Sequence, residues 1–172
     1  DLHFVEDAGR MIGEVLSADS LVILESTVPP RTTEMLARVL GESSGLPADT
    51  LHVAHCPERV IPGNMMHELR NNDRIIGART PEAARMAAEI YSHVLENGSC
   101  HITDDITAEM CKLTENTFRD VNIAYANELS IIFYKMGVNV FALVRLANCH
   151  PRVNILNPGV GLGGHCIAVD PW

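Results

Sequence analysis

A glycine-rich segment holds the side chain with the clearest potential for chemistry. Residues 157–170 read NPGVGLGGHCIAVD, so Cys166 follows a run of closely spaced glycines. Glycines let backbone N–H groups approach a ligand closely, and such groups lower the pKa of a nearby thiol and stabilise an anion. Cys166 is therefore a candidate nucleophile, and a structural cysteine is the alternative that these residues leave open.

The same glycines also match a phosphate-binding pattern. Gly159, Gly161 and Gly164 satisfy G-x-G-x-x-G, the fingerprint of dinucleotide-binding folds. That fingerprint requires a preceding strand, a following helix and a βαβ unit of about 30 residues, whereas only eight residues follow Gly164. We therefore interpret the segment as a loop that brings backbone amides to a ligand and presents Cys166.

Lys112 and Asn116 form a second candidate group. A spacing of four residues places both side chains on one face of a helix, where an amine and an amide can reach the same anionic oxygen. A solvated helix face is the alternative for such a pair. The chain has only two lysines, Lys112 and Lys135, so a general basic surface explains Lys112 poorly.

Glu58 is a third candidate. It follows a proline at the end of a strand-like segment, where α/β proteins place ligand-facing side chains. A carboxylate in that position can activate a water molecule as a general base. The segment therefore predicts a site residue rather than a simple connection.

The remaining cysteines and the histidines do not indicate a further site. No C-x-x-C pair occurs and the number of cysteines is odd, which favours reduced thiols over a disulfide framework. The histidines lack the H-x-x-x-H or mixed Cys/His spacing of zinc ligands, so we predict no metal site. The four other cysteines are expected to be buried structural residues: Cys56, Cys100, Cys111 and Cys149.

The first part of the chain alternates between β-branched runs and helical patterns. Helices are predicted at about 31–41 and 82–95, the second with Thr80 as N-cap and Pro81 at its first position. Strands separated by helices imply βαβ units, so residues 1–104 are predicted to be the latter part of a doubly wound, Rossmann-like parallel sheet. The predicted strands are 21–24, 51–54, 75–77 and 100–102.

From residue 105 the pattern becomes that of one long helix. Apolar residues recur at spacings of three and four to about residue 136, without glycine or proline. Such a helix spans roughly 45 Å, long enough to bridge two domains or to form a dimer interface. Gly137 is a predicted C-terminal cap, and a shorter helix follows at about 140–149. Residues 105–172 are therefore predicted to form a second, helical domain.

Composition excludes some classes of function. The net charge of −9 argues against nucleic-acid binding, which needs clustered Lys and Arg. No apolar run approaches the roughly 18 to 20 residues of a membrane span, and the first residues lack the pattern of a signal peptide, so a cytoplasmic location is expected. The chain begins with Asp1 and ends at Trp172, which suggests a piece of a longer protein.

Four segments together resemble the UDP-glucose/GDP-mannose dehydrogenase family. The pattern G-x-G-x-G-G-x-C-x-x-x-D at 159–170 is similar to the catalytic loop of that family. In the family's order, three others precede it: E-S-T-V-P at 25–29, C-P-E-R at 56–59, and K-L-T-E-N at 112–116 with N-E-L at 127–129. The resemblance covers the chain but not the whole length of the family's proteins. It implies that the NAD pyrophosphate loop and a C-terminal Rossmann-like domain are missing, and that this piece alone is inactive.

The resemblance implies a reaction and its cofactor. The expected activity is the four-electron oxidation of the C6 hydroxyl of a UDP-N-acetylhexosamine by NAD⁺, for surface polysaccharide precursors, through a thiohemiacetal and a thioester on Cys166. The residues within these motifs indicate UDP-N-acetylmannosamine as the substrate, with UDP-N-acetylglucosamine or UDP-glucose as alternatives. A homodimer formed through the long helix is expected. A non-catalytic helical dimerisation module is the alternative of another class.

The resemblance also implies roles for individual residues. Lys112 and Asn116 would hold the oxygen that becomes anionic, Glu58 would activate water, and Asp170 would orient the lysine. Cofactor contacts are expected from Ser26, Thr27 and Glu58, with Thr27 also placing water. Substrate contacts are expected from Arg119, Arg152, Gly161, Gly163 and Gly164. The chain departs from the family at Pro62, where UDP-glucose enzymes have a second glutamate, so no role of that carboxylate is carried over.

Overall fold

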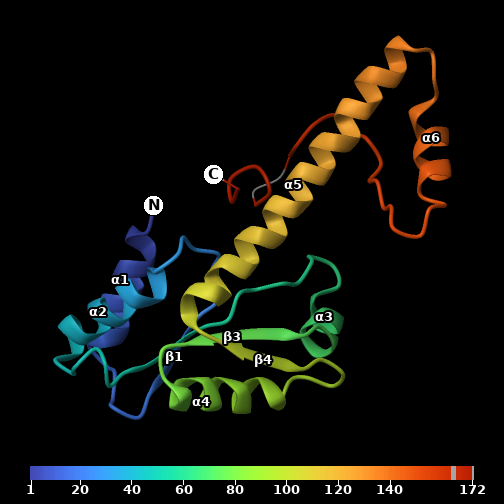
Figure 1. The fold of residues 1–172 in the computed structure, drawn as a ribbon. Helices are drawn as coiled ribbons and strands as arrows, with labels where there is room; N and C mark the ends of the chain where they lie inside the picture. Colours follow the sequence, from blue (N-terminus) through green and yellow to red (C-terminus); the bar gives the residue numbers. More distant parts are fainter. Residues whose placement is uncertain (164–165, 172) are drawn as a thin grey trace. The chain divides into compact units, whose positions relative to one another are not determined.

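The computed structural model of the protein describes residues 1–163 and 166–171. It divides into two compact units, Asp1–Lys112 and Leu113–Trp172, and the boundary falls inside the longest helix. The elements appear in Figure 1 in the order α1 (His3–Gly13), β1 (Leu21–Leu24), α2 (Thr32–Ser44), β2 (His52–His55), α3 (Met65–Asn71), β3 (Arg74–Ala78), α4 (Pro81–Ser92), β4 (Cys100–Thr103), α5 (Asp105–Lys135) and α6 (Val140–Ala147).

The first unit contains a four-stranded sheet in the order β1-β2-β3-β4. The predicted α/β class is confirmed, since β1 and β2 are parallel and so are β3 and β4. The pairing of β2 with β3 is antiparallel, which differs from the fully parallel sheet expected. Parallel neighbours need a crossover connection. The segment between these strands holds only the short helix α3, and β3 starts at the edge where β2 ends.

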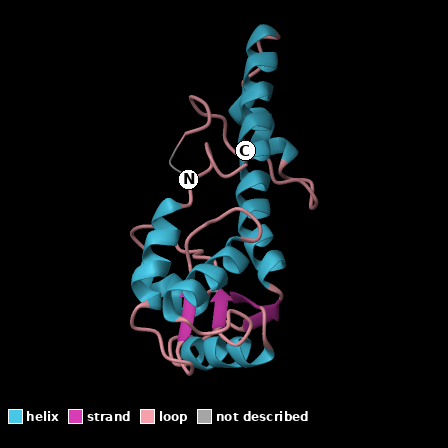
Figure 2. Cartoon of the chain, turned by 90° about the vertical axis from the view of Figure 1, so that its left-hand side faces the viewer, coloured by secondary structure: helices cyan, strands magenta, loops and turns pink. Residues whose placement is uncertain are grey.

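Helices cover both faces of this sheet (Figure 2). Successive strand residues point to opposite faces, so neighbouring residues of β2 enter different hydrophobic clusters. Val53 packs with Leu24 of β1 in a cluster that includes residues of α1 and α2. Ala54 packs with Ile76 of β3 in a cluster that includes residues of α4. The unit is therefore a three-layer α/β/α arrangement.

Local sequence signals explain where α4 starts and where α5 ends. The Thr80 hydroxyl accepts a hydrogen bond from the N–H of Ala83 at 3.2 Å, and Pro81 opens α4. Gly137 follows α5 with a φ of 68°, a conformation that glycine adopts without strain. The predicted N-cap and the predicted C-terminal glycine are both confirmed.

Two helices, α1 and α3, were not predicted from the sequence. The glycines of α1 disfavour a helix by propensity, but they lie on the face that contacts α2. A Cβ on Gly9 would come within 2.8 Å of Leu36 Cδ1, and one on Gly13 within 2.4 Å of Ser43 Cβ. Close approach of the two helices thus requires glycine at these positions.

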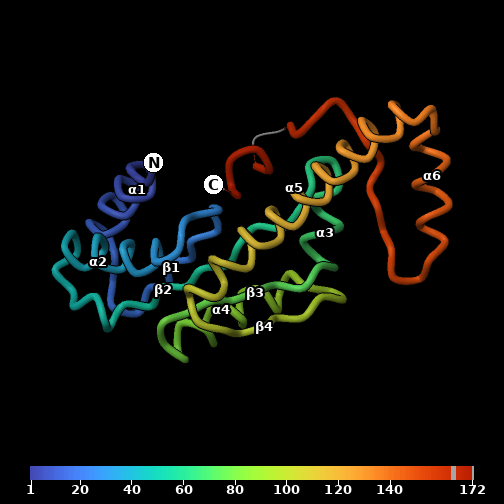
Figure 3. Tube along the Cα trace, turned by 45° about the horizontal axis from the view of Figure 1, so that its top comes forward, coloured from blue at the N-terminus to red at the C-terminus, as the bar shows by residue number. Residues whose placement is uncertain are grey.

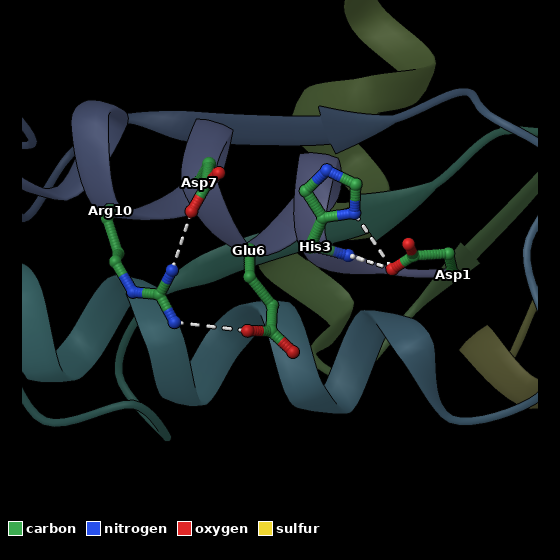
Figure 4. Close-up of polar contacts among 5 residues, drawn as sticks. All are labelled: Asp1, His3, Glu6, Asp7 and Arg10. Atoms are coloured by element: carbon green, nitrogen blue, oxygen red, sulfur yellow. Dashed lines mark hydrogen bonds and ion pairs between the residues drawn. The ribbon is translucent and has the colours of Figure 1, made fainter.

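The other face of α1 carries local polar contacts (Figure 4). Arg10 donates hydrogen bonds to Asp7 at 2.7 Å and to Glu6 at 3.0 Å, the i−3 and i−4 positions. At the start of the helix, the backbone N–H of His3 donates to Asp1 at 3.1 Å. These contacts stabilise α1 locally, as expected for charges spaced along one helix face.

In the second unit the chain turns after α5, forms α6 and returns toward α5 (Figure 3). The returning segment is fixed by Asn148, whose side chain donates to the carbonyl of Ile155 at 2.9 Å and accepts from its N–H at 2.8 Å. None of the helices in the described ranges combines the length and the low polarity that a bilayer span requires.

Candidate active site

The ends of β1 and β2 bring two predicted site segments onto neighbouring connections. Leu24 pairs with His55 in the parallel register, and the pairing continues beyond the strands, since Glu58 N–H donates to the carbonyl of Glu25 at 3.2 Å. Ser26 and Thr27 therefore follow the strand that neighbours the one leading to Glu58. Ligands of α/β proteins bind at the carboxyl ends of parallel strands, so this edge has the right location for a cofactor site.

These side chains keep polar groups available at that edge. Ser26 is exposed, while Thr27 and Glu58 are half-buried. The carboxylate of Glu58 accepts a hydrogen bond from the N–H of Val60, which fixes its orientation. Pro62, further along the same connection, is exposed. Hydroxyl and carboxylate groups of this kind suit the amide and hydroxyl groups of a nicotinamide nucleotide.

Glu109 of α5 forms hydrogen bonds with the start of α2, just after the Ser26–Thr27 segment. Its buried carboxylate, 0% exposed, accepts from the backbone N–H of Arg31 at 2.5 Å. It also accepts from the N–H and the hydroxyl of Thr33, both at 2.7 Å. Arg31 occupies the N-cap with a φ of 72° and offers no side-chain cap. Glu109 therefore replaces the missing cap, and Thr27 does not serve as one.

A second buried group lies behind the strand ends. The Tyr91 hydroxyl of α4 donates to Glu25 at 2.5 Å, and the guanidinium carbon of Arg74 lies 5.2 Å from the centre of the Tyr91 ring. Burial raises the pKa of the Cys56 thiol to about 12. Burial and the bond to Glu25 also raise the pKa of Tyr91. Cys56 is therefore a protonated, unreactive thiol near neutral pH.

His55, the residue before Cys56, is fully buried, with 0% exposure. Neither ring nitrogen has a hydrogen-bond partner in the described part of the chain. Burial lowers the pKa of His55, and the nearby charges of Glu109 and Asp105 oppose that shift. The imidazole is therefore neutral at physiological pH.

Lys112 and Asn116 lie one turn apart on α5, as their spacing predicts. Asn116 is buried, and its amide donates to the Asp170 carboxylate at 2.6 Å. Lys112 is half-buried and belongs to the first unit, whereas Asn116 and Asp170 belong to the second. The structure thus brings together Asn116 and Asp170, two residues that the sequence separates by more than 50 positions.

The glycine loop presents Cys166 at the start of a tight turn. The Cys166 carbonyl accepts from the N–H groups of Val169 at 3.0 Å and Asp170 at 2.9 Å, and its side chain is exposed. Gly161 has a φ of 135°, a conformation that side-chain-bearing residues rarely adopt. A Cβ on Gly161 or Gly163 would meet no described atom within 4 Å. Gly164 lies outside the described residues.

The remaining predicted residues are at the surface. Arg119 and Arg152 are both exposed. The expectation that Cys149 is buried is wrong: it is exposed, because it lies in the turn after α6. Within the described ranges, no three His, Cys, Asp or Glu side chains gather as metal ligands would.

Sequence reasoning missed three supporting residues. Glu109 and Tyr91 act through contacts with residues more than 60 positions away, which no local pattern reveals. Asn127 accepts a hydrogen bond from the N–H of Gly159 at 2.8 Å. Asn127 belongs to the N-E-L segment of the resemblance, and an asparagine inside a long helix is a usable signal because it is a poor helix former.

Comparison with known proteins gives consistent matches along the chain. Residues 1–95 match the NAD binding domain of the UDP-glucose/GDP-mannose dehydrogenase family, and residues 106–172 match the central domain of that family. The chain is 55% identical to the UDP-N-acetyl-D-mannosamine dehydrogenase of Yersinia pestis, covering 100% of this chain and 43% of that protein. It is 54% identical to an NDP-N-acetyl-D-galactosaminuronic acid dehydrogenase of Ralstonia solanacearum, covering 100% of this chain and 42% of that protein.

Solved structures give the same answer. The UDP-D-ManNAc dehydrogenase from Pyrococcus horikoshii superimposes with a TM-score of 0.94 at 49% identity, over 99% of this chain and 41% of that one. A UDP-glucose dehydrogenase from Pyrobaculum islandicum gives a TM-score of 0.87 at 29% identity, over 99% of this chain and 40% of that one. The chain spans less than half the length of these relatives, and within that span both of its parts match domains of one family. The chain therefore belongs to the UDP-glucose/GDP-mannose dehydrogenase family.

Proposed function

We propose that the full-length protein is an NAD-dependent nucleotide-sugar 6-dehydrogenase that oxidises the C6 hydroxyl of UDP-N-acetylmannosamine to a carboxylate. Residues 1–104 would be the C-terminal part of its NAD-binding domain and residues 105–172 its central helical domain. The observation that carries the proposal is the Asn116–Asp170 hydrogen bond of 2.6 Å, because it joins two proposed site residues, and Asp170 lies four positions after the exposed Cys166. The names of the relatives support the choice of sugar.

The cofactor fits the polar edge formed by the ends of β1 and β2. Ser26 and Thr27 would hold the nicotinamide end, with Glu58 on the neighbouring connection. NAD⁺, when bound, supplies the hydride acceptor for both oxidations. The Glu109 and Tyr91 contacts hold this edge in place, since each binds a residue within six positions of Thr27.

Cys166 explains how one site oxidises an alcohol and then an aldehyde. Its thiolate adds to the C6 aldehyde, and the resulting thiohemiacetal carries a hydrogen on C6 that can leave as hydride. Loss of that hydride leaves a thioester on Cys166. Glu58 would take a proton from the water that cleaves the thioester, releasing the carboxylate and the free thiol.

The amine of Lys112 and the amide of Asn116 would stabilise the oxygen that becomes anionic in these steps. Asp170, which accepts from Asn116, would orient this pair. Backbone N–H groups around Gly161, Gly163 and Gly164 would approach the substrate, because these residues lack side chains. Arg119 and Arg152 would meet phosphate or sugar groups.

The second unit also supports a homodimer. Its helices expose a series of large apolar side chains, more than a solvated helix surface requires. A hollow of about 700 Å³ lies where α5 turns into α6, lined in part by Ile131, Tyr134, Val138 and Phe141. The proposal therefore includes a second copy of the protein along α5. The exposed apolar residues of this part of α5 are Phe118, Val121, Tyr125, Ile131, Ile132 and Tyr134.

The proposal also includes a cytoplasmic location, where NAD⁺ and nucleotide sugars are available. The function is tested by following NADH formation by the full-length protein with UDP-N-acetylmannosamine, UDP-N-acetylglucosamine and UDP-glucose. We expect two NADH for each carboxylate formed and the highest kcat/KM with UDP-N-acetylmannosamine. A higher kcat/KM with another of these sugars would contradict the choice of substrate. No turnover with any UDP-sugar, together with a stable dimer, would favour a dimerisation module instead.

A further inference from the structure

We propose that Asn127 is a positioning residue that fixes the start of the loop carrying Cys166. Its side-chain oxygen accepts a hydrogen bond from the N–H of Gly159 at 2.8 Å. The other end of the loop is fixed by Asn116, whose amide donates to Asp170 at 2.6 Å. The inference rests on the proposed function, because positioning matters only if Cys166 reacts.

The two asparagines form a matched pair on α5. They are eleven residues apart on the same helix, which is close to three whole turns, so their side chains leave the helix within about 20° of each other. Gly159 and Asp170, the loop residues that they bind, are also eleven residues apart. One face of the second unit's helix thus holds both ends of the loop.

The glycines of the loop make these two anchors important. Glycine has no side chain to pack, and its backbone loses more conformational freedom on ordering than that of any other residue. A Cβ on Gly159, Gly161 or Gly163 would meet no described atom within 4 Å, so packing at these positions does not fix the backbone. The position of Cys166 is therefore limited by the hydrogen bonds at the two ends of the loop and by the turn in which the Cys166 carbonyl accepts from Val169 and Asp170.

The hydrogen bond made by Asn127 is not a local contact within α5. Asn122, on the same helix, donates its amide to the carbonyl of Phe118, one turn back. Asn127 instead binds a residue 32 positions further along the chain. Asn122 therefore provides a matched control, because changing it removes an asparagine from α5 without touching the loop.

The test uses the full-length protein with Asn127→Leu, Asn127→Ala and Asn127→Asp. Leucine has a similar size but no acceptor, alanine favours the helix and also lacks the acceptor, and aspartate keeps an oxygen for the Gly159 N–H. Asn122→Leu is the control. Three quantities are measured: kcat and KM for carboxylate formation, amide hydrogen exchange of the segment that contains Gly159, and the rate of Cys166 alkylation by iodoacetamide, resolved from that of Cys149 by mass spectrometry.

We expect Asn127→Leu and Asn127→Ala to lower kcat by about 10- to 100-fold, with KM for NAD⁺ unchanged, because a reacting group displaced by an ångström loses that much rate. Exchange at the Gly159 segment should become faster, and the alkylation rate of Cys166 should change. Asn127→Asp should restore most of the activity and the protection, and Asn122→Leu should behave as the unchanged protein. Equal behaviour of the aspartate and leucine variants, or unchanged exchange in all three variants, would overturn the proposal.

Failure of the proposed function would look different. If the unchanged protein oxidises no UDP-sugar, the function is wrong, but the exchange and alkylation rates still report whether Asn127 holds the loop. If the unchanged protein is active while Asn127→Leu and Asn127→Ala retain full kcat, the function stands and the positioning role is wrong. A melting curve for each variant separates both results from loss of folding, since the alanine variant should melt close to the unchanged protein.

Discussion

The two units support their proposed site residues in different ways. In the first unit, the segments after β1 and β2 are held by buried polar side chains from other elements, such as Glu109 and Tyr91. In the second unit, the loop around Cys166 is held by two asparagine side chains and is largely exposed. Substitution of Glu109 or Tyr91 should therefore reduce stability, whereas substitutions in the loop around Cys166 should reduce activity and leave stability almost unchanged.

The units also differ in what they leave exposed. The first unit packs apolar side chains into two clusters on the two faces of its sheet and leaves others exposed, among them Phe4, Val15 and Met66. The second is built on a long helix whose apolar residues remain in part at the surface. A surface of this kind is typical of a part that is covered by another chain or domain. The second unit, although shorter, exposes at least as many large apolar side chains as the first among the described residues.

The largest effect is expected for Cys166→Ser in the full-length protein. Serine has nearly the volume of cysteine, but its hydroxyl is scarcely ionised near pH 7, where a thiol is partly thiolate. Formation of the carboxylate should fall by at least about 10³-fold. Because the side chain is exposed, the melting temperature should stay the same and NAD⁺ should still bind. Release of carboxylate at the original rate would show that Cys166 is not the nucleophile.

The next effect is expected for Lys112→Ala, on the helix that continues from one unit into the other. If the amine stabilises an oxyanion, kcat should fall by about 10²- to 10³-fold, equivalent to roughly 3 to 4 kcal/mol. Steady-state kinetics with saturating substrate measure this change. A rise in KM with unchanged kcat would mean that Lys112 only binds substrate. Lys135→Ala, at the far end of α5, serves as the control.

Much of the fold could be predicted because it depends on local patterns. Each of the four strands lies within one residue of the apolar run predicted for it, and α5 follows the uninterrupted apolar periodicity from residue 105. The direction of β3 was not predictable in this way, because an apolar run does not show whether a strand pairs parallel or antiparallel with its neighbour. Helix α1 was missed because its glycines make sense only once α2 lies against them.

The candidate site likewise has features that local sequence predicts and features that only the folded chain reveals. Lys112 and Asn116 share a helix face, which spacing alone predicts. The contacts of Glu109 and Asn127 join segments that are far apart in the sequence, so only the folded chain reveals them. For Cys149 the prediction of burial was wrong. It was based on residue type alone, whereas the turn after α6 exposes this side chain. The roles assigned to Cys166, Glu58 and the other site residues stay predictions.

A smaller effect, and one on stability, is expected for Glu109→Ala in the first unit. The change leaves the N–H groups of Arg31 and Thr33 and one hydroxyl without their acceptor at the start of α2. The free energy of unfolding should fall by about 2 to 3 kcal/mol, the usual result of leaving buried donors unpaired. Urea denaturation measures it, and Glu89→Ala on the exposed face of α4 is the control. Equal midpoints for the two variants would contradict a structural role for Glu109.

The smallest effect concerns His55 and is visible only as a dependence on pH. Because burial lowers the pKa of this histidine, the folded protein keeps it neutral, whereas the unfolded chain takes up a proton below about pH 6.5. The unfolded state then binds more protons, so stability is complete above that pH and is lost as the pH falls toward the folded pKa. The loss cannot exceed about 1.4 kcal/mol per pH unit for one group. The charges of Glu109 and Asp105 work against it, which is why the effect should be modest.

His55→Leu tests this by removing the titrating group from a site where neither ring nitrogen has a partner among the described residues. Unfolding free energies measured at pH 8 and pH 5.5 should differ less in this variant than in the unchanged protein. His93→Gln, which alters an exposed histidine at the end of α4, should keep the original difference. If His55→Leu and the unchanged protein lose the same stability between these pH values, the proton is taken up elsewhere. The first unit would then owe its acid sensitivity to its carboxylates, and the buried histidine would act only by packing.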